Sequence, residues 1–202
     1  MCQPASFVVT RERVLFSKFG DSHELIITEN KLDDSMRGGD FVRVEIVPPD
    51  GDYSLPLKKW IYKTDQHECP DWYNAKDAEI ACRKALKAWA KHHIVKSGEH
   101  ECAAEQTLIA LGNATVNVSG GEARGYDNCV LNVSGGEVWG NDNCVLNVSG
   151  GTAWGYDNCV LNVSGGEVWG NDNCVLNVSG GTAWGYDNCV LNVSGGEVWG
   201  ND

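Results

Sequence analysis

A strict repeat of 15 residues fills the second half of the chain and constrains its fold more than any other feature. The consensus of the repeat is N-C-V-L-N-V-S-G-G-[ET]-[VA]-W-G-[NY]-D. The six units begin at Asn113, Asn128, Asn143, Asn158, Asn173 and Asn188, and the last unit ends at Asp202. The first unit is degenerate, as terminal units of repeat arrays often are. A strict period excludes an ordinary globular core, in which every position has a different environment, and indicates a stack of identical structural units.

The residues inside one unit favour strand over helix, because three glycines per unit and many Asn and β-branched residues disfavour helix. Cys129, Leu131 and Val133 share one parity, which predicts that they face the interior. After the glycine turn, Val138 is expected to point inward and Trp139 outward. Each unit is therefore one flat coil of two short strands and two turns. The predicted fold is an α+β domain, residues 1–112, that caps an all-β solenoid of six coils, residues 113–202.

Stacking the coils in register, at about 4.8 Å per coil, aligns equivalent residues into ladders. We expect the column that begins at Cys129 to consist of small core side chains. The turn asparagines, from Asn128 to Asn188, are expected to stack their amides, each bonding to the next. The turn aspartates, such as Asp127, are expected to accept N–H bonds of the turns, which would offset their mutual repulsion.

Charged residues are distributed unevenly along the chain, and this distribution indicates which partners the solenoid attracts or repels. Residues 113–202 hold Arg124 alone against ten carboxylates, within a chain whose net charge is −12. Such a surface repels phosphate backbones, so we expect no direct binding of nucleic acid and attraction of a basic protein surface.

Glutamate alternates with threonine in successive units, as in Glu137 and Thr152, which spaces the glutamates by two coils. The one adjacent pair, Glu122 and Glu137, has Arg124 beside it.

An outward stripe of tryptophans, flanked by carboxylates and tyrosines, is the candidate binding site. Exposed apolar patches of this size usually mark an interface. One interpretation is partner docking or self-association; others are that the stacked indoles only shield the strand edges, or that they form a platform for a sugar or a base. The candidate binding residues are Trp139, Trp154, Trp169, Trp184, Trp199, Tyr156, Tyr186, Glu137 and Glu167.

The first 112 residues have the pattern of a small α+β domain. Asp21 and Glu24 have capping-box spacing for a helix that continues to about Leu32. Asn74 with Asp77 is expected to cap a longer helix over residues 75–93. A polar loop and a strand then lead into the first coil, and we expect the domain to block edge pairing there. The expected strands cover residues 6–9, 13–17, 40–48, 59–63 and 107–111. The expected apolar face of the long helix consists of Ile80, Ala81, Leu86, Trp89 and Ala90.

Two His-x-Cys pairs are the candidate metal ligands, since four such side chains can hold zinc tetrahedrally. They are His67 with Cys69 and His100 with Cys102. The spacing is not that of a recognised zinc finger, so ordinary surface or core residues, or a disulfide, remain alternatives. We expect no other cofactor, and no motif indicates a catalytic site.

The first residues, Met1-Cys2-Gln3-Pro4, lack the basic and apolar regions of a signal peptide. No apolar run approaches the roughly 20 residues of a membrane helix. These features predict a cytoplasmic protein with reduced thiols and no membrane partner.

The N-terminal segment resembles an uncharacterised domain encoded by bacteriophages and prophages. The resemblance is carried by Asp21-Ser22-His23-Glu24, by Phe41-Val42-Arg43-Val44-Glu45-Ile46 and by Pro70-Asp71-Trp72-Tyr73. In those proteins tandem repeats of the Asn-Ser-Ser-Val or Asn-Ala-Thr-Val kind follow, and Asn113-Ala114-Thr115-Val116 matches that unit. The resemblance implies a phage origin, a repeat β-helix and the cytoplasm of the host cell. The array is also distantly similar to pentapeptide-repeat proteins, from which it departs in period.

These observations predict a non-enzymatic binding protein that inhibits or sequesters a host factor, such as a defence protein. One alternative is a self-assembling structural protein that forms dimers or filaments through the tryptophan stripe or the last coil. If the last coil does not stack on another copy, we expect the negative charges of Glu197 and Asp202 to protect that end of the solenoid. The other alternative is a metal-dependent N-terminal domain with the solenoid as its scaffold.

Overall fold

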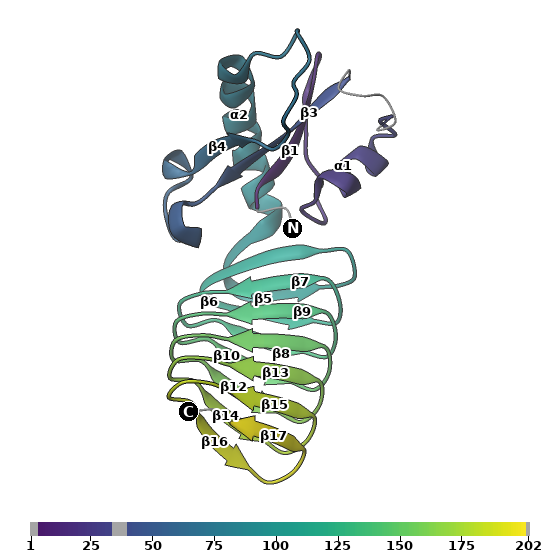
Figure 1. Ribbon diagram of the computed structural model, residues 1–202. Helices are drawn as coiled ribbons and strands as arrows, with labels where there is room; N and C mark the ends of the chain where they lie inside the picture. The colour runs from purple at the N-terminus through teal and green to yellow at the C-terminus, as the bar shows by residue number, and fades with distance from the viewer. Residues whose placement is uncertain (1–3, 34–39, 201–202) are drawn as a thin grey trace. The chain divides into compact units, whose positions relative to one another are not determined.

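The computed structural model describes residues 4–33 and 40–200, so Met1, Cys2, Gln3 and Asp202 lie outside the described residues. The chain divides into two compact units, one ending at His93 and the other beginning at Ile94. The first unit is α+β and the second is a parallel β-solenoid (Figure 1). The predicted fold class, an α+β unit followed by an all-β solenoid, is therefore confirmed.

A four-stranded antiparallel sheet with the order β2-β1-β3-β4 forms the centre of the N-terminal unit. Its strands match the predicted segments closely, because these segments are rich in β-branched and aromatic residues. Two short 3₁₀ turns, Pro49–Gly51 and Leu57–Lys59, lie between β3 and β4. The strands are β1 (Ser6–Thr10), β2 (Val14–Leu15), β3 (Phe41–Val47) and β4 (Ile61–Thr64).

The short helix α1 (His23–Glu29) ends before the predicted Leu32 and is capped by Ser22, not by Asp21. The Ser22 hydroxyl accepts the backbone N–H of Leu25 at 3.1 Å. Asp21 accepts bonds from outside the helix instead: its Oδ1 atom lies 2.8 Å from the Ser6 backbone nitrogen and 2.9 Å from the Trp89 indole nitrogen. Burial raises the pKa of Asp21 to about 6.

The long helix α2 (Ala75–His93) begins as predicted, since the Asn74 side chain accepts the backbone N–H groups of Lys76 and Asp77. Its predicted apolar face is partly wrong, because Ile80 is 53% exposed. Side chains at spacings of three and four share one face of a helix, and Ile80 is out of step with that stripe. The buried residues of α2 are Ala78, Cys82, Leu86, Trp89 and His93.

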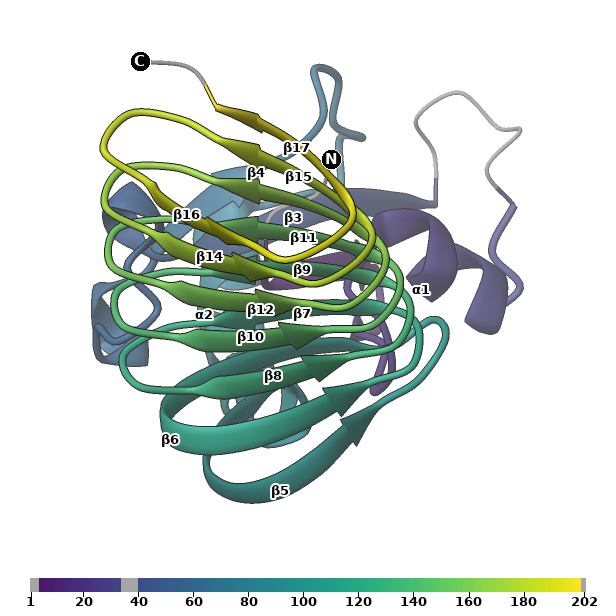
Figure 2. The same ribbon diagram turned by 90° about the horizontal axis from the view of Figure 1, so that it is seen from below.

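In the solenoid, each repeat contributes one strand to each of two parallel faces, and Figure 2 shows the successive coils stacked along the rod. Every pairing between neighbouring coils is parallel and joins equivalent residues, for example Trp154 with Trp139 and Leu146 with Leu131. One face contains β8 (Val130–Val133), β10 (Val145–Val148), β12 (Val160–Val163), β14 (Val175–Val178) and β16 (Val190–Val193). The other contains β7 (Glu122–Gly125), β9 (Glu137–Gly140), β11 (Thr152–Gly155), β13 (Glu167–Gly170), β15 (Thr182–Gly185) and β17 (Glu197–Gly200).

The solenoid begins before the sequence repeat, so that it has about seven turns. The segment predicted as a polar loop is the strand β5 (Ile94–Cys102), which pairs in parallel with β6 (Thr107–Val118). β6 in turn pairs with β7 and β8, and so spans both faces. Backbone pairing needs no apolar repeat, which is why polar residues 96–101 can form a strand. Residues 94–112 thus belong to the solenoid unit.

The interior of the solenoid follows the predicted alternation. Cys129, Leu131 and Val133 are buried, as are their equivalents in the next three coils. Val138 and Ala153 fill the facing column from the other strands, while Glu137 lies exposed. The buried apolar residues of successive coils contact one another, so the core is one continuous column and not a set of separate clusters.

The second glycine of each Gly-Gly turn is required by both conformation and space. Gly151 has a φ of +75°, and a Cβ atom there would lie 2.6 Å from the carbonyl oxygen of Gly136 in the preceding coil. The contact is with backbone that is itself fixed by the stacking, so it cannot move aside.

Replacing Gly151 with alanine should therefore lower the free energy of unfolding by about 2–4 kcal/mol, combining the left-handed backbone penalty with overpacking. The measurement is urea unfolding followed by far-ultraviolet circular dichroism. Val145→Thr, an outward substitution in the same coil, should change stability by less than about 0.5 kcal/mol. Equal stabilities of the two variants would contradict the turn geometry.

Candidate functional site: a tryptophan ladder on the solenoid

The predicted tryptophan stripe is a ladder of stacked indoles. Trp139, Trp154, Trp169, Trp184 and Trp199 are each the third residue of their strand, and the in-register pairing places them side by side. Successive ring centroids lie 4.9, 5.4, 4.6 and 5.3 Å apart, with interplanar angles of 10°, 14°, 7° and 13°. The ladder is thus a direct consequence of the repeat register.

Stacking decides which part of each indole is available. The first four tryptophans are half-buried, and Trp199 is 48% exposed. Because the ring faces contact one another, the surface presents the edges of the rings. A sugar or base inserted between two indoles would need roughly 7 Å between their planes, two stacking distances of about 3.5 Å. The observed centroid separations, at most 5.4 Å, leave no such space.

Arg124 occupies the ladder position of the first repeat, paired in register with Trp139. Its guanidinium carbon lies 5.1 Å from the centroid of the Trp139 ring, a cation–π contact. Two nitrogens of the same group bond to a Glu122 oxygen at 2.9 and 3.1 Å. Arg124 therefore covers the first ring face of the ladder and neutralises Glu122, in agreement with its predicted place beside the adjacent glutamate pair.

The glutamates alternate with threonines along the same strands, as predicted. Thr152 pairs in register with Glu137 on one side and Glu167 on the other, and Thr182 separates Glu167 from Glu197. The three glutamates are exposed. We call this surface, formed by the five tryptophans with Glu137, Thr152, Glu167, Thr182 and Glu197, the Trp–Glu face. Tyr156 and Tyr186 follow β11 and β15 directly and are half-buried.

The opposite face carries an amide ladder, but not at the predicted position. The Nδ2 atom of Asn132 donates to the Oδ1 atom of Asn117 at 2.8 Å, and the pattern continues to Asn192. The turn asparagines expected to stack bond through the backbone instead; the N–H of Asn143, for example, donates to the carbonyl of Asp127. The strand asparagines form the ladder because parallel pairing holds their side chains one coil apart.

A shallow groove of about 550 Å³ runs along this Asn–Ser face, lined by the amide ladder and by the serine column. Its polar groups are largely engaged within the protein: each internal amide both donates and accepts along the ladder, and Ser149 donates to the carbonyl of Val133. This engagement makes the groove a weaker candidate for ligand binding than the Trp–Glu face.

The turn aspartates behave as predicted. Asp127, Asp142 and their equivalents have φ near +60°, a conformation that Asp tolerates. Each carboxylate accepts the backbone N–H of the preceding coil, for example Asp142 from Asp127 at 3.0 Å. The like charges of this column are therefore each solvated by a backbone N–H group.

The cysteine column is a core feature, as predicted. Its thiols are buried as far as Cys174, and Cys189 is half-buried. Hydrogen bonds between neighbouring thiols shift their pKa values in opposite directions, raising the pKa of Cys144 and lowering that of Cys159. The thiols are therefore engaged with one another inside the solenoid, away from solvent. The column is therefore a packing element.

The two predicted His-x-Cys pairs lie in different units. His67 and Cys69 are exposed in the segment after β4. His100 and Cys102 lie on β5, where the Cys102 thiol donates to the carbonyls of Glu122 and Gln106 at 3.5 and 3.6 Å. Burial raises the pKa of Cys102 to about 11, so its thiol is protonated at neutral pH. Cys102 is therefore a buried residue of the first coils, and its thiol bonds to their backbone carbonyls.

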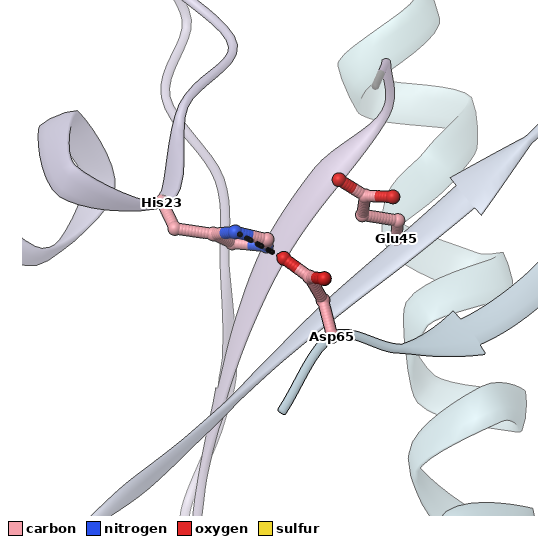
Figure 3. Close-up of side chains that lie close together, drawn as sticks. All are labelled: His23, Glu45 and Asp65. Atoms are coloured by element: carbon pink, nitrogen blue, oxygen red, sulfur yellow. Dashed lines mark ion pairs between the residues drawn. The ribbon is translucent and has the colours of Figure 1, made fainter. Parts of the chain in front are cut away.

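A different cluster of possible metal ligands was not foreseen. Among the described residues, His23, Glu45 and Asp65 form the group whose ligand atoms all lie within 4.8 Å of one another (Figure 3). They come from α1, from β3 and from the residue after β4. No local motif joins them, and the sequence around His23 indicates only the start of a helix. Sheet pairing of β3 with β4 was the information needed to find them.

No helix in the described part of the chain combines the length and the apolar character needed to cross a membrane. Comparisons of the chain with protein-family models, with curated proteins and with solved structures find no match. The function is therefore inferred from the residues of the site themselves.

An inner rung of the ladder should contribute more stability than the last one. Trp169 stacks on two neighbours and Trp199 on one. At about 0.5–1.5 kcal/mol per aromatic pair, Trp169→Leu should lose roughly 1–3 kcal/mol of stacking and Trp199→Leu about half of that. Urea unfolding of both variants measures the difference, and losses of the same size would argue against a stacking contribution.

Alkylation at pH 8 should separate the exposed thiol from the buried ones. Burial raises the pKa of Cys82 to about 12, which leaves roughly a thousandfold less thiolate than in an ordinary thiol. Iodoacetamide should therefore modify Cys69, which is exposed, while Cys82 and Cys102 react only after unfolding. Peptide mass spectrometry with and without urea provides the readout, and rapid native labelling of Cys82 would contradict its placement.

Proposed function

We propose that this protein is a non-enzymatic binding protein that docks a basic protein surface on its Trp–Glu face. The observation that carries the proposal is the composition of that face: an apolar strip of indole edges beside exposed carboxylates at regular spacing. An extended apolar strip rimmed by charge is typical of interfaces. Residues that recur unchanged along a rod favour recognition of a surface over conversion of a small substrate.

Arg124 illustrates the chemistry that such a partner would use. It combines contact with an indole and an ion pair with a glutamate on the same face. A partner would meet ring edges rather than ring faces along most of the ladder, so its apolar side chains would pack on the strip while its Lys or Arg side chains pair with Glu137, Glu167 and Glu197. These glutamates recur every two coils, roughly 10 Å apart. That spacing matches two turns of an α-helix, so it suits basic residues seven apart on one face of a helix.

The excess of negative charge supports the choice of a basic partner. In residues 113–202 the only basic side chain, Arg124, is already paired. Such a field accelerates encounter with positively charged proteins, including those whose basic surface ordinarily contacts nucleic acid. Together with the resemblance to phage-encoded proteins, this supports a role in the host cytoplasm as an inhibitor or sequestering agent of a host factor, such as a defence protein.

Self-assembly through the Trp–Glu face is the second candidate, since an apolar strip can pair with a copy of itself. Two such faces would, however, bring the glutamate columns of both copies together. Their repulsion disfavours this pairing at neutral pH and low salt, whereas a basic partner relieves it. Light scattering over a concentration series distinguishes the two: a mass that rises with concentration supports assembly.

The proposal predicts that a photo-crosslinking residue placed at Thr152 captures a partner from host lysate, whereas the same residue at Val145 on the Asn–Ser face does not. Glu137→Gln, Glu167→Gln and Glu197→Gln combined should weaken binding of the captured protein about tenfold, at about 0.5 kcal/mol per rim ion pair. The affinity should also fall as salt is added.

The matched control removes three exposed carboxylates from the other unit, by Glu12→Gln, Glu68→Gln and Asp71→Asn. It makes the same change in net charge and should leave the affinity within about twofold. Capture from Val145 rather than Thr152, or equal weakening by both triple variants, would contradict the Trp–Glu face as the binding surface.

A further inference from the structure

The cluster of His23, Glu45 and Asp65 joins three elements of the N-terminal unit and lies outside the surface assigned to partner binding. His23 is the first residue of α1, Glu45 lies in the middle of β3, and Asp65 follows the end of β4. His23 is 1% exposed and Glu45 8% exposed, while the Asp65 side chain is 51% exposed. Figure 3 shows the His23 imidazole directed toward the Asp65 carboxylate, with Glu45 beside this pair. The cluster is thus buried on one side and open on the other.

The hydrogen bonds of His23 restrict its protonation state. Its Nε2 atom lies 3.1 Å from the carbonyl oxygen of Val44, which can only accept, so Nε2 carries a proton and donates. Its Nδ1 atom lies 3.4 Å from an Asp65 oxygen, which is also an acceptor when ionised. A neutral imidazole would therefore direct the Nδ1 lone pair at a carboxylate. Either a second proton or a cation shared with the carboxylates removes this repulsion.

The geometry fits a metal ion better than a simple ion pair. Histidines that bind metals commonly donate their other ring nitrogen to a backbone carbonyl, as Nε2 does here. Two ligands of a tetrahedral ion with bonds of about 2.0–2.1 Å lie roughly 3.4 Å apart. That is the separation of the His23 Nδ1 and Asp65 Oδ2 atoms, 3.4 Å. The Glu45 carboxylate needs only a small movement to complete a set of three, since all three ligand atoms lie within 4.8 Å of one another.

The surrounding charge also favours a cation. Glu45 is largely removed from water, where a carboxylate attracts a nearby cation more strongly than it does in solvent. Asp21 adds a further carboxyl near His23. Lys63, opposite Glu45 in the strand pairing, is exposed and offers one positive charge. A divalent ion between Glu45 and Asp65 would interact favourably with both carboxylates.

We propose that His23, Glu45 and Asp65 bind one divalent transition-metal ion, with zinc as the reference ion. One imidazole and two carboxylates form the protein ligands, and the exposed side of Asp65 leaves a coordination position open to solvent or to a small oxygen ligand. The ion joins α1, β3 and β4, which places it as a clamp across the sheet of the N-terminal unit.

The test is zinc titration of the full chain, after removal of metal by chelation, followed by calorimetry. We expect one zinc ion per chain, and a dissociation constant at least about tenfold higher for Asp65→Asn and for Glu45→Gln. Both substitutions keep the shape of the side chain, and because Asp65 is half-exposed its variant should fold; circular dichroism checks this. Glu68→Gln and Cys69→Ser, close in sequence and exposed, are the controls and should leave zinc affinity unchanged.

Cobalt substitution gives a second readout that affinity alone does not provide. Cobalt bound by one imidazole and two carboxylates should show weak visible bands without thiolate-to-cobalt charge transfer. The proposal is overturned if zinc does not bind saturably, if neither Asp65→Asn nor Glu45→Gln weakens binding, or if Cys69→Ser abolishes binding and the cobalt spectrum shows a thiolate band. The last result would assign the ion to the His67 and Cys69 pair.

Discussion

In-register parallel stacking is the constraint on which the rest of the solenoid depends. Each residue lies beside its equivalent in the next coil. Each side chain must therefore be able to pack beside another of the same or a similar kind. The outward positions meet this condition in four ways: amides donate to amides, indoles stack on indoles, aspartates accept backbone N–H groups, and glutamates are separated by threonines. Inside, the same condition selects small and branched apolar side chains that pack along one column.

This constraint explains how much of the solenoid could be predicted. A period of 15 residues fixes the coil, and alternation within it assigns Leu131 inward and Trp139 outward. The amide ladder was assigned to Asn128 instead of Asn132 because both are polar, and only strand pairing shows which one lies beside its equivalent. Strand β5 was missed since its pairing rests on the backbone and its residues do not repeat. The sequence predicts that the tryptophans stack, but only the ring separations in the structure show that the ring edges, and not the ring faces, meet the solvent.

The N-terminal unit obeys different rules, because no two of its positions are equivalent. Local signals gave its helices and strands well: Asn74 caps α2 as its sequence context indicates. Contacts between distant segments could not be predicted in the same way. Asp21 has a capping residue's position in the sequence, yet Ser6 and Trp89 hold it in place. The grouping of His23, Glu45 and Asp65 likewise depends on which strands are neighbours. One chain therefore combines a surface that repeats with a cluster that occurs once.

The indole ladder has an optical consequence. Five chromophores with nearly parallel planes and centroid separations of 4.6–5.4 Å are close enough for their electronic transitions to couple. Light absorbed by one ring is then shared along the column, and an electron vacancy formed on one indole can migrate to the next. A rod that owes its order to hydrogen bonding and apolar packing thereby also contains a one-dimensional array of π-systems, with Arg124 placing a positive charge at its first member.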